Sequence, residues 1–108
     1  MDRLGAFALT LACEIPVVFM LARHLPARRV VPVAAGASCL THPLAWRIAM
    51  LLTPDVYRLG VALIEAGVVV VEAIWYRCWL RLSFGRAVGI SLLANAASVS
   101  VGWLLWRA

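Results

Sequence analysis

Five polar residues lie inside otherwise hydrophobic segments of the chain, and their types suit proton or cation chemistry. The carboxylates of Glu14, Glu65 and Glu72 accept protons and bind cations, His42 offers an imidazole, and Asn95 offers an amide. A charged side chain at the centre of a membrane helix costs about 2.5–3.5 kcal/mol, so acids in such segments usually have a functional role. The sequence therefore predicts a polar site made of these five residues.

The spacing of Glu65 and Glu72 is helical. Residues seven apart lie about 20° apart around a helix and roughly 10 Å apart along its axis, so both acids share one face. The ten or so Leu, Ile and Val residues of this span each favour insertion by about 0.3–0.6 kcal/mol, and two ionised acids would cancel most of that total. The pair is therefore expected either to face a polar interior or to carry protons.

Smaller polar residues flank these candidates at helical spacings of three and four. They form one polar stripe in each of the first, second and fourth apolar segments. Hydrogen bonding between packed helices is the simplest role for such hydroxyl groups. The supporting polar residues are Thr10, Ser38, Ser91 and Ser98.

Four apolar segments must position these residues. The 108-residue chain is 65% hydrophobic and 14% charged, whereas about a quarter of a soluble domain is charged. A membrane helix needs about 20 mostly apolar residues, and the short loops here force neighbouring helices to be antiparallel. We predict an all-α polytopic membrane protein, a single transmembrane domain of residues 1–108 with four helices in an antiparallel bundle. The spans are about 4–22, 30–52, 56–80 and 84–106.

The connections carry helix-start signals. Thr53 followed by Pro54 is typical of a turn that opens a helix, and Ser83 is a predicted N-cap of the last span. No internal repeat is evident, because Glu14 and Glu72 correspond only loosely.

All ten basic residues are arginines, and they mark span ends rather than a nucleic-acid site. The positive-inside rule places the more basic loops in the cytoplasm. Six arginines around the first and third loops against four on the other side put these loops inside and both termini outside, in a bacterial inner membrane. The lipid bilayer is thus a predicted partner and nucleic acid is not. Tryptophan and tyrosine residues, Tyr76 among them, are expected to form belts at the membrane surfaces.

Several short motifs resemble those of a group of small four-span bacterial membrane proteins, an uncharacterised family. They are Glu-Ile-Pro at 14–16, Thr-His-Pro-Leu-Ala-Trp at 41–46, Glu65 with Glu72, and Asn-Ala-Ala-Ser at 95–98. The resemblance covers nearly the whole chain and implies no activity. It implies that Glu14, His42, Glu65, Glu72 and Asn95 form the polar signature of the family.

A second, local resemblance is to the CAAX-type intramembrane proteases. Their Glu-Glu-x-x-x-Arg motif is similar to Val-Glu-Ala-Ile-Trp-Tyr-Arg at 71–77. The first glutamate of the motif is missing, the arginine lies one residue further on, and His42 precedes Glu72 instead of following it.

The leading hypothesis is an integral membrane protein whose midplane site binds and transports a proton, a cation or a proton-coupled small substrate. Glu65 and Glu72 are the expected principal acceptors, with Glu14, His42 and Asn95 beside them. Because four helices enclose little volume, a transport pathway is expected to need a homo-oligomer, most simply a dimer.

Two alternatives remain open on the sequence. One is a metal-dependent intramembrane hydrolase, with a divalent metal ion held by Glu65, Glu72 and His42. The chain has no His-Glu-x-x-His motif, so the sequence leans against an enzyme and assigns no catalytic residue. The other alternative is a non-catalytic subunit whose glutamates pair with groups on a partner protein.

Overall fold

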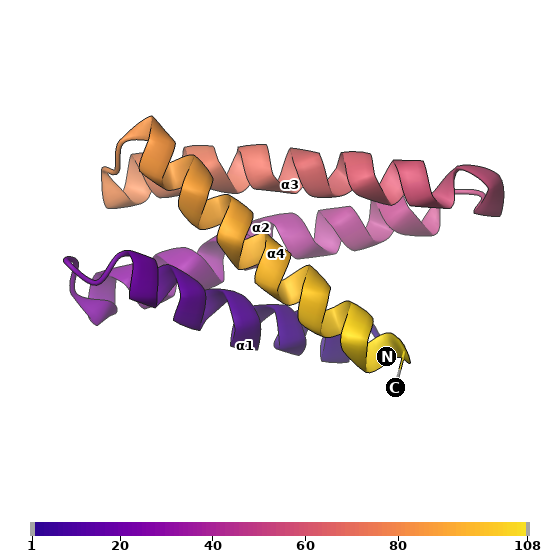
Figure 1. Ribbon diagram of the computed structural model, residues 1–108, viewed down its shortest axis with the longest axis horizontal. Coiled ribbons are helices and arrows are strands. Elements are labelled where there is room, and N and C mark those ends of the chain that lie inside the picture. Colours follow the sequence, from indigo (N-terminus) through magenta and orange to yellow (C-terminus); the bar gives the residue numbers. More distant parts are fainter. Residues whose placement is uncertain (1, 108) are drawn as a thin grey trace.

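The computed structural model describes the backbone of residues 2–107 and the side chains of residues 2–105, and this part of the chain is almost entirely helical (Figure 1). Each helix lies within three residues of a span expected from the sequence. The elements are α1 (Arg3–Leu21), α2 (Ala27–Met50), the short 3-10 helix η1 (Pro54–Val56), α3 (Tyr57–Leu80) and α4 (Phe84–Arg107).

The helix ends follow from local hydrogen bonds and backbone geometry. The Asp2 carboxylate accepts a hydrogen bond from the Gly5 N–H at 2.6 Å and caps α1. Ser83 Oγ accepts from the Arg86 N–H at 3.3 Å, so the predicted cap of α4 is confirmed. Thr53 precedes Pro54 at the start of η1, as its turn signal predicted. At the other end of α3, Arg81 adopts a left-handed conformation with φ of 53°, which stops the helix.

The four helices form a closed ring of neighbours. Helix α1 packs against α2 and α4, and α3 packs against the same two helices. Figure 1 shows that α1 and α3 run in the same direction, while α2 and α4 run in the opposite direction and cross each other. Helix α4 leaves α3 near their connection and reaches α1 near the two chain termini. The helices of each hairpin therefore diverge at the end of the bundle that holds the termini.

The distribution of side chains is that of a membrane protein. The buried polar residues are Glu14, Ser38, Thr41, Glu72, Ser91 and Asn95, whereas many large hydrophobic side chains are exposed. Leu4 is 79% exposed and Leu63 is 64% exposed, which suits contact with lipid tails and not with water. Three helices are long and apolar enough to cross a membrane by length and composition: Arg3–Leu21, Pro54–Leu80 and Phe84–Leu105.

Helix α2 falls outside this group, although it has 24 residues like α3. Its first turn holds Arg28 and Arg29, and its middle carries Ser38, Thr41 and His42. These polar residues lower its mean hydropathy. Ser38 and Thr41 are buried, so the polarity of α2 reflects its contacts inside the bundle.

The contacts correct the expectation that the chain has no internal repeat. Buried positions of α1 and its C-cap each have a buried counterpart in α3 that lies 58 residues later in the sequence. The pairs are Glu14 with Glu72, Val18 with Tyr76, and Ala22 with Leu80. Buried positions of α2 recur in α4 57 residues later: Val30 with Ala87, Ala34 with Ser91, Ala37 with Ala94, and Ser38 with Asn95. The change from 58 to 57 reflects one extra residue between Ala22 and Val30, which are eight positions apart, compared with Leu80 and Ala87, which are seven apart.

Two hydrogen bonds across the helix ends obey the same relation. Arg29 Nη2 donates to the carbonyl of Trp79 at 3.3 Å, and Arg86 Nη2 donates to the carbonyl of Leu21 at 3.3 Å. Arg29 of α2 thus caps the C-terminal end of α3, and Arg86 of α4 caps the C-terminal end of α1. The chain is therefore two helical hairpins, α1–α2 and α3–α4, related by an approximate two-fold axis along the bundle.

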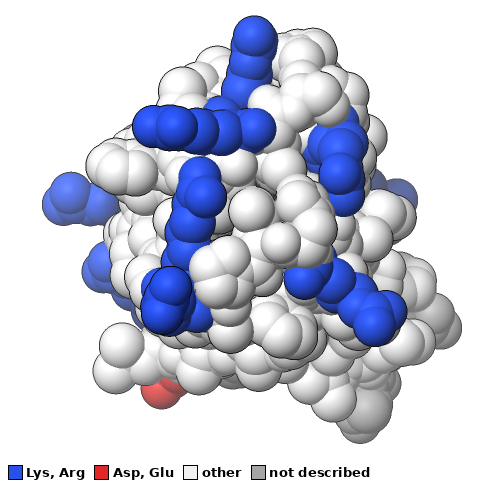
Figure 2. All heavy atoms as spheres, turned by 90° about the vertical axis from the view of Figure 1, so that its left-hand side faces the viewer, with Lys and Arg blue, Asp and Glu red and all other residues white. Residues whose placement is uncertain are grey.

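The hydrophobic core lies toward the end of the bundle that holds the two hairpin connections. Val18, Tyr76 and Leu80 pack there with small residues of α2 and α4. Arginine side chains gather on the outside of this end (Figure 2). Tyr76 is fully buried, so the prediction that it belongs to an aromatic belt at the membrane surface is wrong. It is the repeat equivalent of Val18, which is also buried in the core.

A close contact between α2 and α3 generates a stability prediction. Trp75 Nε1 donates to the carbonyl of Val33 at 2.9 Å, and a Cβ at Gly36 would lie 3.1 Å from Trp75 Cζ2. Because this hydrogen bond holds the indole in place, we expect Gly36→Ala to lower the free energy of unfolding by about 1 kcal/mol. Unfolding in detergent micelles, followed by circular dichroism, measures it.

Gly67→Ala is the matched control, because nothing lies within 4 Å of its added Cβ. Helix propensity alone should make that variant more stable by up to about 1 kcal/mol. Equal stability of the two variants would contradict the packing of Trp75 on Gly36.

Candidate functional site

Glu72 joins three helices. Its Oε2 accepts a hydrogen bond from Thr41 Oγ1 at 2.8 Å, and its Oε1 accepts from Asn95 Nδ2 at 2.6 Å. The side chain is 1% exposed. Through these two bonds α3 is tied to both α2 and α4.

Glu14 does the same for the opposite helix. Its Oε1 accepts from Ser38 Oγ at 3.3 Å and its Oε2 from Ser98 Oγ at 3.1 Å, which ties α1 to α2 and α4. The side chain is 2% exposed. We call these two groups the acid clamps: Glu14 with Ser38 and Ser98, and Glu72 with Thr41 and Asn95.

The acid clamps are equivalent under the internal repeat. Glu14 corresponds to Glu72, Ser38 to Asn95, and Thr41 to Ser98. Both bonds of one clamp therefore map onto both bonds of the other. A pair of contacts that recurs in both halves serves the common scaffold of the two hairpins.

The protons in the acid clamps can be counted. Thr41 Oγ1 carries one proton but lies 2.8 Å from Glu72 Oε2 and 3.0 Å from the carbonyl of Ala37. Ser98 Oγ likewise lies 3.1 Å from both Glu14 Oε2 and the carbonyl of Asn95. A hydroxyl has one proton, so each of these hydroxyl groups either shares it between the two acceptors or accepts from a protonated carboxyl group.

Other predicted polar residues support this core. Asn95 Nδ2 also donates to the carbonyl of Ser91 at 2.8 Å, and Ser91 Oγ donates to the carbonyl of Val69 at 2.8 Å. Thr10 Oγ1 donates to the carbonyl of Ala6 in its own helix at 3.0 Å. Ser91 therefore links α4 to α3, whereas Thr10 forms no bond between helices in the described structure.

A cavity of about 610 Å3, which we call the vestibule, opens at the end of the bundle that holds the termini. All four helices contribute to it. A smaller void of about 50 Å3 shares Thr10, His42, Glu65 and Ser98 with the vestibule and also touches Glu14 and Asn95. The vestibule is lined by Ala6, Leu9, Thr10, His42, Trp46, Tyr57, Glu65, Ser98, Val99, Gly102 and Trp103. The small void therefore lies between the vestibule wall and both acid clamps.

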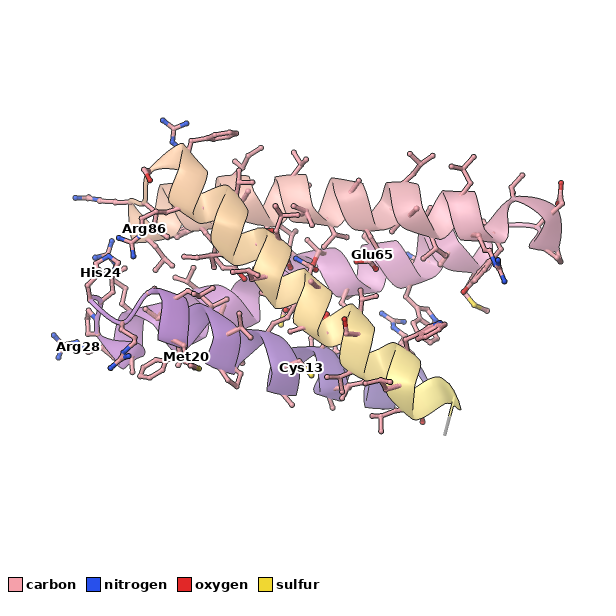
Figure 3. All side chains as sticks on the ribbon, viewed as in Figure 1. Cys13, Met20, His24, Arg28, Glu65 and Arg86 are labelled. Carbon is pink, nitrogen blue, oxygen red and sulfur yellow. The ribbon has the colours of Figure 1, made fainter. Side chains whose placement is uncertain are left out.

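Glu65 lies on the vestibule wall and differs from the other two acids. Figure 3 shows it on the inner side of α3, facing α2 and α4. It is half-buried, and among residues 2–105 no hydrogen bond or ion pair reaches its carboxylate. Glu65 and Glu72 share a face of α3 as predicted, but only Glu72 belongs to an acid clamp.

His42 lines the same cavity through its ring. The imidazole makes an edge contact with Phe7, with ring centroids 5.1 Å apart, and a tilted contact with Trp46 at 6.1 Å. Its Nε2 is buried without a hydrogen-bond partner in the described structure. In the same part of the chain, no group of three His, Cys, Asp or Glu side chains is close enough to hold a metal ion.

Two residues of the polar core were missed in the sequence. Thr41 binds Glu72, and its spacing of three from Ser38 places both on one face of α2, which was a usable signal. Tyr76 is fully buried and its hydroxyl has no hydrogen-bond partner among the described residues. No spacing rule separates this tyrosine from its neighbours Trp75 and Trp79.

No family model, curated protein or solved structure matches the chain. The class of protein is therefore defined by the fold and its buried groups. It is an all-α protein with helices fit to cross a membrane and a polar core of buried glutamates held by hydrogen bonds.

The acid clamps make a prediction about coupling. Thr41→Val should lower the free energy of unfolding by about 0.6–1.7 kcal/mol, the range of hydrogen bonds between membrane helices. Glu72→Met removes the same hydrogen bond. In the double variant with Thr41→Val, the loss in free energy of unfolding should therefore be smaller than the sum of the two single losses. When Thr41→Val is combined with Glu14→Met, in the other clamp, the losses should add. Equilibrium unfolding of the single and double variants in mixed micelles gives both coupling energies.

The same experiment with Ser98→Ala reverses the pattern. This variant should couple to Glu14→Met and add to Glu72→Met, because Ser98 binds the other carboxyl group. Additive losses for all four pairs would show that the hydroxyl groups do not hold the carboxyl groups.

Proposed function

We propose that the protein binds a proton or a cation at Glu65, within a bundle of four membrane-spanning helices, and transports it across the membrane. The supporting observation is the half-buried Glu65 carboxylate, which lies on the vestibule wall beside Thr10, His42 and Ser98 and has no partner among residues 2–105. A half-buried carboxylate without a hydrogen-bond or ion-pair partner is available to bind a proton or a cation. In this proposal α2 is the fourth span, since it has the length of α3 and packs beside it.

Glu14 and Glu72 have a different role in the proposal from the one the sequence suggested. Each of their carboxyl oxygens accepts a hydrogen bond from α2 or α4, so in this proposal they hold the scaffold. The first acid met from the vestibule is Glu65. His42, Thr10 and Ser98 lie beside it on the cavity wall.

The two ends of the bundle support a site with one-sided access. The vestibule opens at the end that holds the termini, whereas Val18, Tyr76 and Leu80 fill the centre toward the arginine-rich end. With the basic loops in the cytoplasm, the vestibule faces the outside of a bacterial inner membrane. Transport then requires the packed half to open after the site is loaded.

The reason for expecting a homo-oligomer changes. One chain encloses a cavity of about 610 Å3 with walls from all four of its helices. The proposed site therefore draws its residues from one protomer, and a dimer stays a prediction.

Flux measurements test the proposal. Purified protein in liposomes loaded with a pH-sensitive dye should take up protons under a potassium diffusion potential, alone or when sodium or an organic cation is present on the other side. Glu65→Gln, which keeps size and polarity but cannot ionise, should reduce this flux to that of empty liposomes. Glu65→Asp should retain part of it.

Asp55→Asn is the control that removes the same charge elsewhere. Asp55 lies in η1, fully exposed, and the hydrogen bond from Thr53 lowers the pKa of its carboxyl group. That variant should transport like the unmodified protein. Flux that persists in folded Glu65→Gln protein, or no flux from the unmodified protein with any of these cations, would refute the proposal.

A further inference from the structure

We propose that the ligand of this site is an amphiphilic organic cation, with its charged group at Glu65 and its apolar part in a groove between α3 and α4. This inference rests on the proposed function and specifies the chemical class of the ligand. It follows from the shape of the groove and from the place where the internal repeat is broken.

The groove lies on the outer face of the α3–α4 hairpin and has a volume of about 420 Å3. Its residues are Glu65, Ala66, Val69, Leu92, Asn95, Ala96 and Val99. Asn95 is already bound to Glu72 and to the carbonyl of Ser91, which leaves Glu65 as the free polar group of the groove. Glu65 also lines the vestibule, so one carboxylate stands where the apolar groove meets the vestibule.

The crossing of the helices explains why a groove exists here. Helix α4 diverges from α3 toward the end that holds the termini (Figure 1). The side chains at the seam are short, since Ala66 and Ala96 face it and both are exposed. In a membrane, an exposed seam of this kind is in contact with lipid tails, so an apolar ligand reaches it from the bilayer.

The equivalent seam of the other hairpin is filled. Under the repeat, Glu65 corresponds to Phe7 and Val99 corresponds to His42. The rings of Phe7 and His42 contact each other at 5.1 Å between α1 and α2. Two aromatic rings thus occupy one seam at the level where the other holds a carboxylate and a valine.

This difference assigns the groove to ligand binding. The acid clamps, the capping arginines and the buried faces are common to both hairpins and account for the fold. Glu65 and the open seam occur in one hairpin only, so the scaffold does not require them. A lone carboxylate beside an apolar groove complements a molecule with a single positive charge and an apolar tail.

The aromatic residues of the vestibule suit the charged group. Trp46 and Trp103 correspond under the repeat, and both line the cavity with Tyr57. Aromatic faces attract alkylammonium groups, and the attraction grows when water is excluded. A quaternary ammonium group at Glu65 would therefore have a carboxylate and aromatic faces within one cavity.

Binding of decyltrimethylammonium tests the inference. The protein is placed in nanodiscs, and heat of binding is measured by calorimetry after subtraction of identical empty nanodiscs. We expect saturable binding at one site per chain. Tetramethylammonium, which lacks the tail, and decyl sulfate, which has the opposite charge, should bind at least about tenfold more weakly.

Variants separate the carboxylate from the groove. Glu65→Gln and Ala66→Leu should each weaken binding of decyltrimethylammonium at least about tenfold, the first by removing the charge and the second by filling the groove. Ala8→Leu is the matched control, because Ala8 is the exposed repeat equivalent of Ala66 on α1 and should leave binding unchanged. Ala96→Leu provides a second way to fill the groove if Ala66→Leu fails to fold.

The outcomes distinguish this inference from the proposed function. Binding no stronger than that of empty nanodiscs, or equal binding by the Ala66→Leu, Ala96→Leu and Ala8→Leu variants, overturns the amphiphilic ligand and its groove. If flux that depends on Glu65 persists in that case, the proposed function stands alone. Loss of specific binding together with flux that is independent of Glu65 overturns both.

Discussion

The bundle depends on two buried carboxyl groups that each hold the same two helices. Glu14 of α1 and Glu72 of α3 lie on helices that do not contact each other in the described chain, yet both bind α2 and α4. In a hydrocarbon solvent the apolar surfaces of helices have little preference for one another over lipid. Polar bonds between helices therefore fix which faces meet, and here they fix all four at one depth.

The same bonds determine where the molecule is packed and where it is open. Between the acid clamps and the hairpin connections, small residues of α2 and α4 allow close contact around Tyr76 and Leu80. Beyond the clamps the helices of each hairpin diverge, and the vestibule occupies the space between them. A polar middle layer thus separates a close-packed half from a hollow half. The carboxylate of Glu65 lies in the hollow half, on the wall of the vestibule.

Much of this fold follows from sequence patterns, because hydrophobic length and turn chemistry are local properties. The helix ends were predicted from hydrophobic length, the Ser83 cap from its residue type, and the inward-facing polar stripes that hold Glu14, Glu72 and Asn95 from helical spacing. The internal repeat was not, since few identical residues survive and only buried positions and hydrogen bonds reveal it. The partner of Glu72 on α2 was missed as well: Thr41 resembles any helix-packing hydroxyl until the crossing of α2 and α3 is known. The groove beside Glu65 depends on that crossing geometry, which no single helix encodes.

The approximate two-fold axis has a consequence for stoichiometry. Two separate copies of one hairpin, assembled around such an axis, would place identical residues at both seams: two carboxylates, or two phenylalanine rings. A single chain that carries both hairpins is free of this constraint, because positions 7 and 65 can differ. Covalent linkage thus allows a single carboxylate at one seam, while Phe7 and His42 occupy the equivalent seam. The asymmetry of the two seams is therefore a property of one chain, which a symmetric pair of identical hairpins does not have.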